Sequence, residues 1–352
     1  MNKISDFAQG SKRIGILGAT GIIGQSLAEI LQQKKLTVLK GGRGLENGPD
    51  TKKVNIDEPR SLKEFIDRCD IIINCTGPSL LTNQKILPAV VNAGKDYIDA
   101  FGWTNSKDSL KQEASRIILN AGSVPGMLSV LIRSMYKAET QEMKVWSGGR
   151  EGGSIGSVGD IILSSINGYG ESNCYIEDSE TVKNKNLYLE LFDGAEELPD
   201  KISTQLILTS EIRSVVKYLG VQNIRNYTIW AEERMKRIIM FGCVEASRLK
   251  KEEDLNKLFS TVLREINQLN KSKQPWFTIV IKSIEEYETT VLRLDTNDSS
   301  KLTAAMLAYM ADTLIHHEVA GGVYWPFELA DSDEVLHLIQ NLGISVDIHG
   351  EL

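Results

Sequence analysis

Residues 13–24 read Arg13-Ile-Gly-Ile-Leu-Gly-Ala-Thr-Gly-Ile-Ile-Gly24. The run 14–17, apolar apart from Gly15, is typical of a buried parallel strand, and the residues after the turn have the apolar spacing of a helix. Between them, Gly18, Gly21 and Gly24 form a variant of the glycine pattern that binds dinucleotides. Such glycines permit a sharp turn, close approach of a pyrophosphate and close packing of the helix on the strand. The stretch therefore predicts a dinucleotide-binding βαβ unit.

The first turn of the predicted helix is expected to hold the phosphates. Its free backbone N–H groups and the positive end of the helix dipole both favour an anion. The expected cofactor contacts at this turn are Gly18, Thr20, Gly21, Ile22 and Gly24, with the Thr20 hydroxyl as an extra donor. A glycine-rich turn without a ligand is the alternative, and the strand before it and helix after it favour binding.

The end of the second predicted strand indicates which nicotinamide cofactor is bound. A domain selective for NAD usually places Asp or Glu there, to accept a hydrogen bond from the ribose 2′-hydroxyl. Here the chain reads Thr37-Val-Leu-Lys-Gly-Gly-Arg-Gly44, and no acid follows until Glu46. Arg43 can pair with a 2′-phosphate, so we predict NADP(H) rather than NAD(H). The alternative is that Arg43 is a solvated loop charge.

The first third of the chain alternates short apolar runs with helical patterns. This rhythm predicts right-handed crossovers and a doubly wound parallel sheet, that is, an α/β Rossmann domain. The expected strands are 14–17, 37–39, a weak one at Val54, 71–73, 97–98 and 117–119, and the expected helices include 22–35 and 87–92.

A different pattern begins near residue 125. Residues 276–281 and 286–294 are β-rich runs separated by a few mostly polar residues, which predicts an antiparallel hairpin. Residues 252–269 and 301–317 have helical spacing. The second part is therefore expected to be an α+β domain with a mixed or antiparallel sheet.

Three segments follow from these patterns. We predict a Rossmann domain over 1–127, an α+β substrate and dimerisation domain over 128–318, and a C-terminal segment over 319–352 that could pack back on the Rossmann domain. The hairpin offers a flat strand face that can pair across a two-fold axis, so we expect a homodimer.

Composition excludes several classes of partner. The 352 residues are 41% hydrophobic and 25% charged, with a net charge of −7. This acidic balance argues against general binding to nucleic acid or anionic membranes. The four cysteines have no metal-ligand spacing, so we expect no metal site and reduced thiols in a cytoplasmic protein. No N-terminal signal peptide or apolar membrane span is predicted.

Further motifs carry a resemblance to a known family. They are Asp70-Ile-Ile-Ile-Asn-Cys-Thr-Gly-Pro78, Ala93-Gly-Lys-Asp-Tyr-Ile-Asp99, Ala121-Gly-Ser-Val-Pro-Gly126 and Val319-Ala-Gly-Gly-Val-Tyr-Trp-Pro326. With the glycine turn, these stretches resemble the saccharopine-dehydrogenase-like (saccharopine reductase-type) family. The likeness is good over the first third of the chain, moderate near its end and loose between.

The resemblance implies where the chemistry takes place. Thr76, Gly77 and Pro78 end the strand at 71–73, where open α/β sheets bind ligands, and are expected to lie along the nicotinamide. The family implies a nicotinamide bound between two domains and reduction of C=N bonds. We therefore predict an NADPH-dependent reductase of an imine, thiazoline or opine-type bond in an amino-acid-derived substrate. The alternatives are a stand-alone enoyl reductase acting on a carrier-bound acyl chain and a non-catalytic NADP(H)-binding regulator.

Hydride transfer leaves a proton to be delivered, and several side chains are candidates. Asp99 ends a neighbouring strand, and its alternative is a helix cap or a loop hydrogen bond. Tyr169 lies between glycines in the second domain, and its alternative is a packed turn aromatic. Arg150 is a candidate ligand of a substrate carboxylate, or else a surface charge. His316 and His317 suit the end of a helix rather than a metal. Cys75 is interpreted as a small buried thiol rather than a nucleophile.

Overall fold

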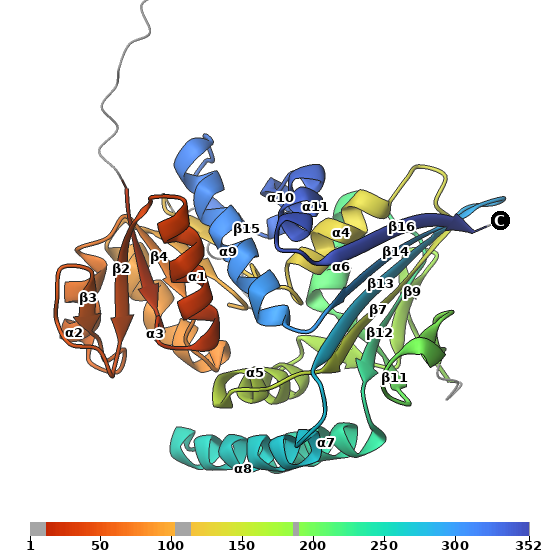
Figure 1. The fold of residues 1–352 in the computed structure, drawn as a ribbon, viewed down its shortest axis with the longest axis horizontal. Coiled ribbons are helices and arrows are strands. Elements are labelled where there is room, and N and C mark those ends of the chain that lie inside the picture. The colour runs from red at the N-terminus through yellow and green to blue at the C-terminus, as the bar shows by residue number, and fades with distance from the viewer. Residues whose placement is uncertain (1–11, 103–113, 186–189, 352) are drawn as a thin grey trace, which may run out of the picture.

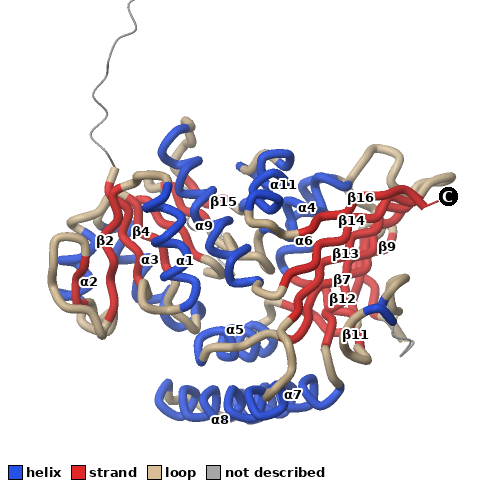
Figure 2. The backbone as a smooth tube through the Cα atoms, viewed as in Figure 1, coloured by secondary structure: helices blue, strands red, loops and turns tan. Residues whose placement is uncertain are grey.

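The computed structural model describes residues 12–102, 114–185 and 190–351. Within these residues the strands form one sheet of seven and one of nine. Figure 1 shows the first sheet at the left, the second at the right, and α9 (Ser299–His316) between them. Figure 2 shows the same division, with the strands gathered in two groups and further helices below them.

The first sheet is parallel throughout, and its order is β15-β6-β5-β4-β1-β2-β3. Its strands are β1 (Arg13–Leu17), β2 (Thr37–Gly42), β3 (Thr51–Lys53), β4 (Ile71–Asn74), β5 (Asp96–Asp99), β6 (Arg116–Ile118) and β15 (Gly322–Tyr324). The first six strands have the order of a Rossmann domain, with the change of direction between β1 and β4. That position is where such domains bind dinucleotides.

Helices cover both faces of this sheet because its strands are apolar on both sides. Ile14 and Ile16 belong to the core under α1 (Ile22–Gln33) and α9. Leu17 and Ile72 face the other way, into a core formed with α2 (Pro59–Ile66) and α3 (Ser79–Asn92). The predicted doubly wound parallel sheet is confirmed.

The second sheet is mixed. Its main order is β10-β9-β12-β7-β13-β14-β16, and β11 pairs with β12 and β8. Its strands are β7 (Glu142–Arg150), β8 (Gly170–Ser172), β9 (Cys174–Glu177), β10 (Glu180–Lys183), β11 (Ser203–Thr209), β12 (Ile224–Trp230), β13 (Trp276–Ile284), β14 (Thr289–Thr296) and β16 (Ser345–Glu351). Only the β7–β12 pair is parallel among the described strand pairs of this sheet. The predicted α+β class of the second domain is confirmed.

Two groups of helices accompany the second sheet. On one side lie α4 (Met127–Met135), α6 (Ser210–Leu219), α10 (Pro326–Leu329) and α11 (Ser332–Asn341). The other group is a layer of α5 (Ile155–Ile166), α7 (Glu233–Ala246) and α8 (Glu252–Asn270), which share their own apolar cluster. In Figure 1 this layer lies below both sheets, with α5 nearest the first domain.

The C-terminal segment contributes to both sheets. β15 adds to β6 in the first sheet, whereas β16 pairs with β14 in the second. Since β13 pairs with β7 and β14 with β16, the predicted hairpin has no free edge. Pairing of that hairpin's edge across a two-fold axis is therefore not supported, and the homodimer and the segment boundaries stay predictions.

The helix expected over 87–92 begins earlier, at Ser79. Pro78 precedes it, and Pro88 inside it lacks a backbone N–H, so the sequence pattern looks broken. The buried face formed by Ile86, Leu87 and Val90 nevertheless holds the segment against the sheet. Ser79 therefore starts a helix directly at the carboxyl end of β4, which places that helix beside the predicted site.

Candidate nicotinamide-binding site

The glycine turn joins β1 to α1 as expected. Gly18 has φ +80°, and a Cβ atom there would lie 2.7 Å from the Cys75 carbonyl oxygen, so a larger residue does not fit. The backbone N–H groups of Gly18 and Ala19 donate to the Gly41 carbonyl, each at 3.1 Å. The turn is thus fixed against the ends of both neighbouring strands.

The N-terminus of α1 is open to a phosphate. Gly21 is its N-cap, with no side-chain cap and no acidic residue in the first turn. Ile22 is 59% exposed, so the helix start faces solvent. A Cβ atom on Gly24 would overlap the Gly18 carbonyl oxygen. Because glycine has no Cβ atom, the helix can approach the turn this closely. Uncapped N–H groups at a helix start are the usual ligands of a dinucleotide pyrophosphate.

Arg43 lies directly after β2 and is exposed. It makes no hydrogen bond or ion pair with any other residue in the described part of the chain. The Thr20 side chain is 3.5 Å from where a Cβ atom of Gly42 would lie, so the glycine turn and the Arg43 loop adjoin. A charge in this position is free to contact the adenosine end of a bound dinucleotide.

The turn after β4 is held by Asn74. The Asn74 Oδ1 atom accepts hydrogen bonds from the Thr76 N–H at 3.0 Å and the Thr76 hydroxyl at 2.6 Å. Its Nδ2 group donates to Asp99 at 2.8 Å. Gly77 and Pro78 follow and lead into α3. Asn74 therefore connects the turn expected along the nicotinamide to the end of β5.

Asp99 is enclosed at the carboxyl end of β5, only 1% exposed. Besides Asn74, its carboxylate accepts hydrogen bonds from the Tyr97 hydroxyl at 2.5 Å, the Ser79 hydroxyl at 2.9 Å and the Phe101 N–H at 3.0 Å. Burial raises the pKa of Asp99, and these four donors oppose that effect. With so many donors, Asp99 is suited to fixing β4, β5 and α3 relative to one another.

The second domain approaches this same turn through α5. A Cβ atom on Gly77 would lie 2.8 Å from Gly156 Cα, and one on Gly159 would overlap the Pro78 ring. Asp160, beside Gly159, accepts a hydrogen bond from the Ser79 N–H at 2.5 Å. Sequence reasoning missed Asp160. The available signal was that it is the single charged residue of α5, a helix otherwise built from apolar and small polar residues.

Tyr169 lies near this region, against the loop after β5. It is 8% exposed, and its ring centroid is 5.0 Å from that of Phe101, in an edge-on arrangement. Burial raises the pKa of Tyr169 well above its ordinary value. This placement fits the packed turn aromatic, and a role in proton transfer stays a prediction.

Arg150 lies at the end of β7, inside the second domain. It is 2% exposed, which corrects the interpretation as a surface charge. Its guanidinium pairs with Asp200 and with Glu232, the latter at 2.8 Å. A role in binding a substrate carboxylate stays a prediction, but two carboxylates already neutralise this charge.

Other titratable groups add little to the site. Burial raises the pKa of the Cys75 thiol, which disfavours the nucleophilic thiolate. His316 and His317 are exposed at the end of α9. No group of His, Cys, Asp and Glu suited to a metal occurs within residues 12–102, 114–185 and 190–351. No helix in those ranges is long and apolar enough to cross a membrane.

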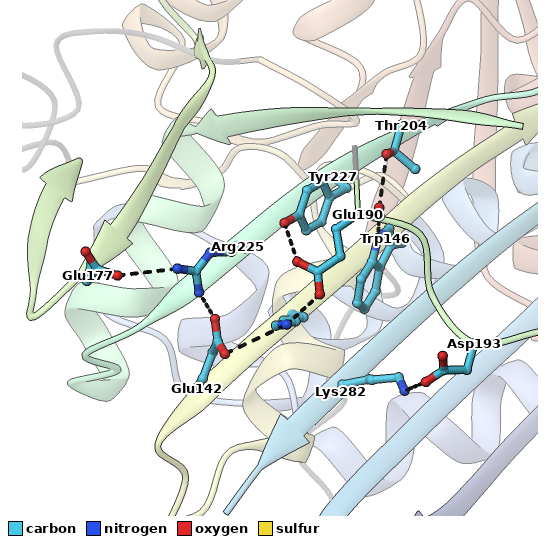
Figure 3. Close-up of polar contacts among 10 residues, drawn as sticks. Glu142, Trp146, Glu177, Glu190, Asp193, Thr204, Arg225, Tyr227 and Lys282 are labelled. Carbon is cyan, nitrogen blue, oxygen red and sulfur yellow. Dashed lines mark hydrogen bonds and ion pairs between the residues drawn. The ribbon is translucent and has the colours of Figure 1, made fainter. Parts of the chain in front are cut away.

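A separate polar network lies on the second sheet (Figure 3). Lys144 and Lys282 are directly opposite in the β7–β13 pairing, an unfavourable arrangement for like charges. Glu190 pairs with Lys144 and accepts from Tyr227 at 2.9 Å, while Asp193 pairs with Lys282. These contacts hold the chain after residue 189 on the sheet, so the network has a structural explanation.

Comparison with known proteins agrees with this geometry. A sequence model of the NAD dependent epimerase/dehydratase family matches residues 14–91. No curated protein sequence matches the chain. The matched residues run from β1 almost to the end of α3, which includes the glycine turn, Arg43 and the Thr76–Pro78 turn. This match supports binding of a nicotinamide dinucleotide.

Solved structures show which fold the whole chain adopts. Saccharopine dehydrogenase (L-Glu forming) from Saccharomyces cerevisiae is similar over 97% of this chain and 100% of that chain, with a TM-score of 0.67 at 12% sequence identity. UDP-glucose 4-epimerase from Thermus thermophilus, in complex with NAD, is similar over 24% of this chain and 36% of that chain, with a TM-score of 0.22 at 17% identity. The first of these likenesses spans almost the whole chain and shows the fold of saccharopine dehydrogenase, which the sequence motifs indicated.

Proposed function

We propose that this chain is an NADPH-dependent oxidoreductase that reduces a C=N bond in an amino-acid-derived substrate, an imine, a thiazoline or an opine-type bond. The observation that carries the proposal is the turn at Gly77 and Pro78. It ends β4 beside the β1–β4 change of direction and is covered by α5 of the second domain. A substrate held there lies between the two domains, next to the nicotinamide end of a bound dinucleotide.

The residues at the glycine turn fit the cofactor. Gly18 and Gly24 allow the tight turn and the close approach of α1, Gly21 has no side chain at the helix start, and the uncapped start of α1 supplies N–H donors for the pyrophosphate. Thr76 to Pro78 would lie along the nicotinamide. When bound, the reduced cofactor supplies a hydride. The protein binds, orients and shields the reactants, and it must supply a proton to the substrate nitrogen.

Selectivity for NADPH rests on Arg43. It is exposed, has no partner among the described residues and adjoins the glycine turn, so its guanidinium is free for a 2′-phosphate. We expect NADPH to bind the wild-type protein at least about tenfold tighter than NADH. Arg43→Ala should weaken NADPH by about tenfold and leave NADH unchanged, as measured by calorimetric titration.

Arg60→Ala is the matched control for that titration, because Arg60 is an exposed arginine on α2 whose ion pair with Glu64 is local. It should leave both affinities unchanged. Equal affinity of the wild-type protein for NADPH and NADH would overturn the NADP(H) assignment. An unchanged preference in Arg43→Ala would overturn the role of Arg43.

A panel of cyclic imines, thiazolines and mixtures of amino acids with 2-oxo acids tests the reaction, with NADPH consumption as the readout. Turnover of at least one C=N compound is expected. If NADPH binds but the protein turns over neither these compounds nor enoyl thioesters, the result would favour the non-catalytic regulator.

A groove between α5 and α8 favours an enoyl reductase as the second candidate. It is lined by Ile155 and Leu263 together with Arg264 and Lys271. An apolar groove with two cations suits an acyl chain on an acidic carrier. Turnover of carrier-bound enoyl thioesters, but not of imines, would replace the C=N assignment.

A further inference from the structure

Asp160 belongs to the second domain, yet its carboxyl group reaches the first. Its Oδ1 atom accepts from the Ser79 N–H at 2.5 Å. A Cβ atom placed on Gly77 would lie 3.4 Å from Asp160 Oδ2, so the other oxygen faces the turn expected along the nicotinamide. One side chain of the second domain is thereby placed next to the predicted reaction centre.

Ser79 lies between two carboxyl groups with different surroundings. Its hydroxyl donates to Asp99, and its N–H donates to Asp160. Asp99 is fully buried among four donors, whereas Asp160 is mostly buried but keeps some exposed surface and accepts from the N–H groups of Ser79 and Leu80. Of the two groups, Asp160 is therefore the more accessible one.

The surroundings of Asp160 favour its protonated form. Burial raises the pKa of Asp160 to about 8, and the nearby charge of Asp99 acts in the same direction. Among the elements packed on α5, α7 brings Cys243, which is uncharged because burial raises its pKa. Lys85 of α3 pairs with Asp57 and Glu252, and Glu171 of β8 pairs with Arg213. α8 packs on α5 as well, and no cation on it or on any other element in the described ranges lowers the pKa of Asp160.

We propose that Asp160 is the proton donor of the reaction, an inference that rests on the proposed function. A hydride from the cofactor adds to the carbon of the C=N bond, and the π electrons move to the nitrogen. The nitrogen takes the proton from the Asp160 carboxyl group. The products are the amine, an Asp160 carboxylate and the oxidised cofactor, and the reverse reaction returns the proton to Asp160.

This placement has a consequence that needs no substrate. The oxidised nicotinamide ring is positively charged and the reduced ring is neutral, so a nearby carboxylate binds the oxidised form better. Binding of NADP⁺ should therefore release a proton from Asp160, while binding of NADPH should not. The affinity for NADP⁺ should rise with pH, as the carboxyl group ionises.

The experiment measures the dissociation constants of NADP⁺ and NADPH between about pH 6 and about pH 9, a range that brackets the raised pKa of Asp160. In the wild-type protein, NADP⁺ binding should tighten by about three- to tenfold across this range relative to NADPH. Asp160→Asn keeps an acceptor oxygen for Ser79 and should abolish the relative change. Asp254→Asn, on the surface of α8, is the matched control and should retain it.

A second measurement uses the wild-type protein alone. A pH-indicator dye should report proton release when NADP⁺ is added near the pKa of Asp160, and no release with NADPH. If this difference is absent, or if it persists in Asp160→Asn, the assignment of Asp160 is wrong. Nucleotide binding would still stand in that case, and so would the proposed function. Failure of both nucleotides to bind the wild-type protein would overturn the proposed function itself.

Discussion

Gly24 packs so closely on the glycine turn that a larger residue there should affect both stability and nucleotide binding. A Cβ atom there would overlap the Gly18 carbonyl oxygen and lie 2.8 Å from Ala19 Cα, both backbone atoms that cannot rotate away. We expect Gly24→Ala to lower the free energy of unfolding by about 1–3 kcal/mol. The displaced turn should also bind NADPH at least about tenfold more weakly.

Gly44→Ala provides the comparison for Gly24→Ala. Gly44 lies two residues after β2, near the same site, and nothing is within 4 Å of the position its Cβ atom would take. Urea unfolding and NADPH titration of the two variants separate a specific steric effect from the general loss of a glycine. Equal behaviour of the two would contradict the packing explanation.

Individual site residues differ in how far the sequence could identify them. Gly18, Gly24 and Asp99 lie within motifs of contiguous residues, so the sequence placed Gly18 and Asp99 at strand ends and Gly24 in the helix after the turn. Asp160 touches Ser79 across 81 positions of sequence, through a contact between two domains. No local pattern encodes such a contact, because it depends on how α5 packs on the end of β4.

Among the helices, α4 has an N-terminus capped from another element. The Glu211 carboxylate, on α6, accepts from the Gly126 N–H at 2.6 Å and the Ser129 N–H at 3.3 Å. Burial raises the pKa of Glu211 to about 7, from an ordinary value of 4.5. Between these values the folded protein keeps the proton that the unfolded chain releases. The contribution of Glu211 to stability is therefore complete below pH 4.5 and falls as pH rises towards 7.

Glu211→Gln tests this dependence, since the amide oxygen can still accept from Gly126. The free energy of unfolding of the wild-type protein relative to the variant should decrease from about pH 5 to about pH 7, by at most about 1.4 kcal/mol per pH unit. Urea unfolding at several pH values measures it. A wild-type advantage that stayed constant, or grew with pH, would show that Glu211 is ionised in the folded protein.

Elements with strong local patterns could be predicted, and elements defined by distant partners could not. The rhythm of strands and helices up to residue 102 gave the first sheet, because each strand is apolar on both faces. β15 spans only Gly322–Tyr324 and joins β6, so its identity depends on a neighbour some 200 residues away in the chain. The partner of β16 is likewise fixed by the open edge of β14.

At the scale of the whole molecule, the two sheets share one hydrophobic core. The cluster that contains Ile14 and Ile16 of β1 also contains Ile279 and Ile281 of β13, joined through the buried faces of α4 and α9. A shared core couples the unfolding of the parts that it connects. Although the chain has two sheets, it should therefore unfold as one cooperative unit.

Gly159→Ala tests this coupling at the contact between the domains. Its added Cβ atom would overlap the Pro78 ring and lie 3.0 Å from the Phe259 side chain, so α5 must move away from the first domain. We expect a loss of about 1–3 kcal/mol of unfolding free energy, despite the better helix propensity of alanine. Gly152→Ala, in the same glycine-rich stretch but with open space around its Cβ position, should change stability by less than about 0.5 kcal/mol. Tryptophan fluorescence and circular dichroism should give one coincident transition for both variants, whereas two separate transitions would show that the domains unfold independently.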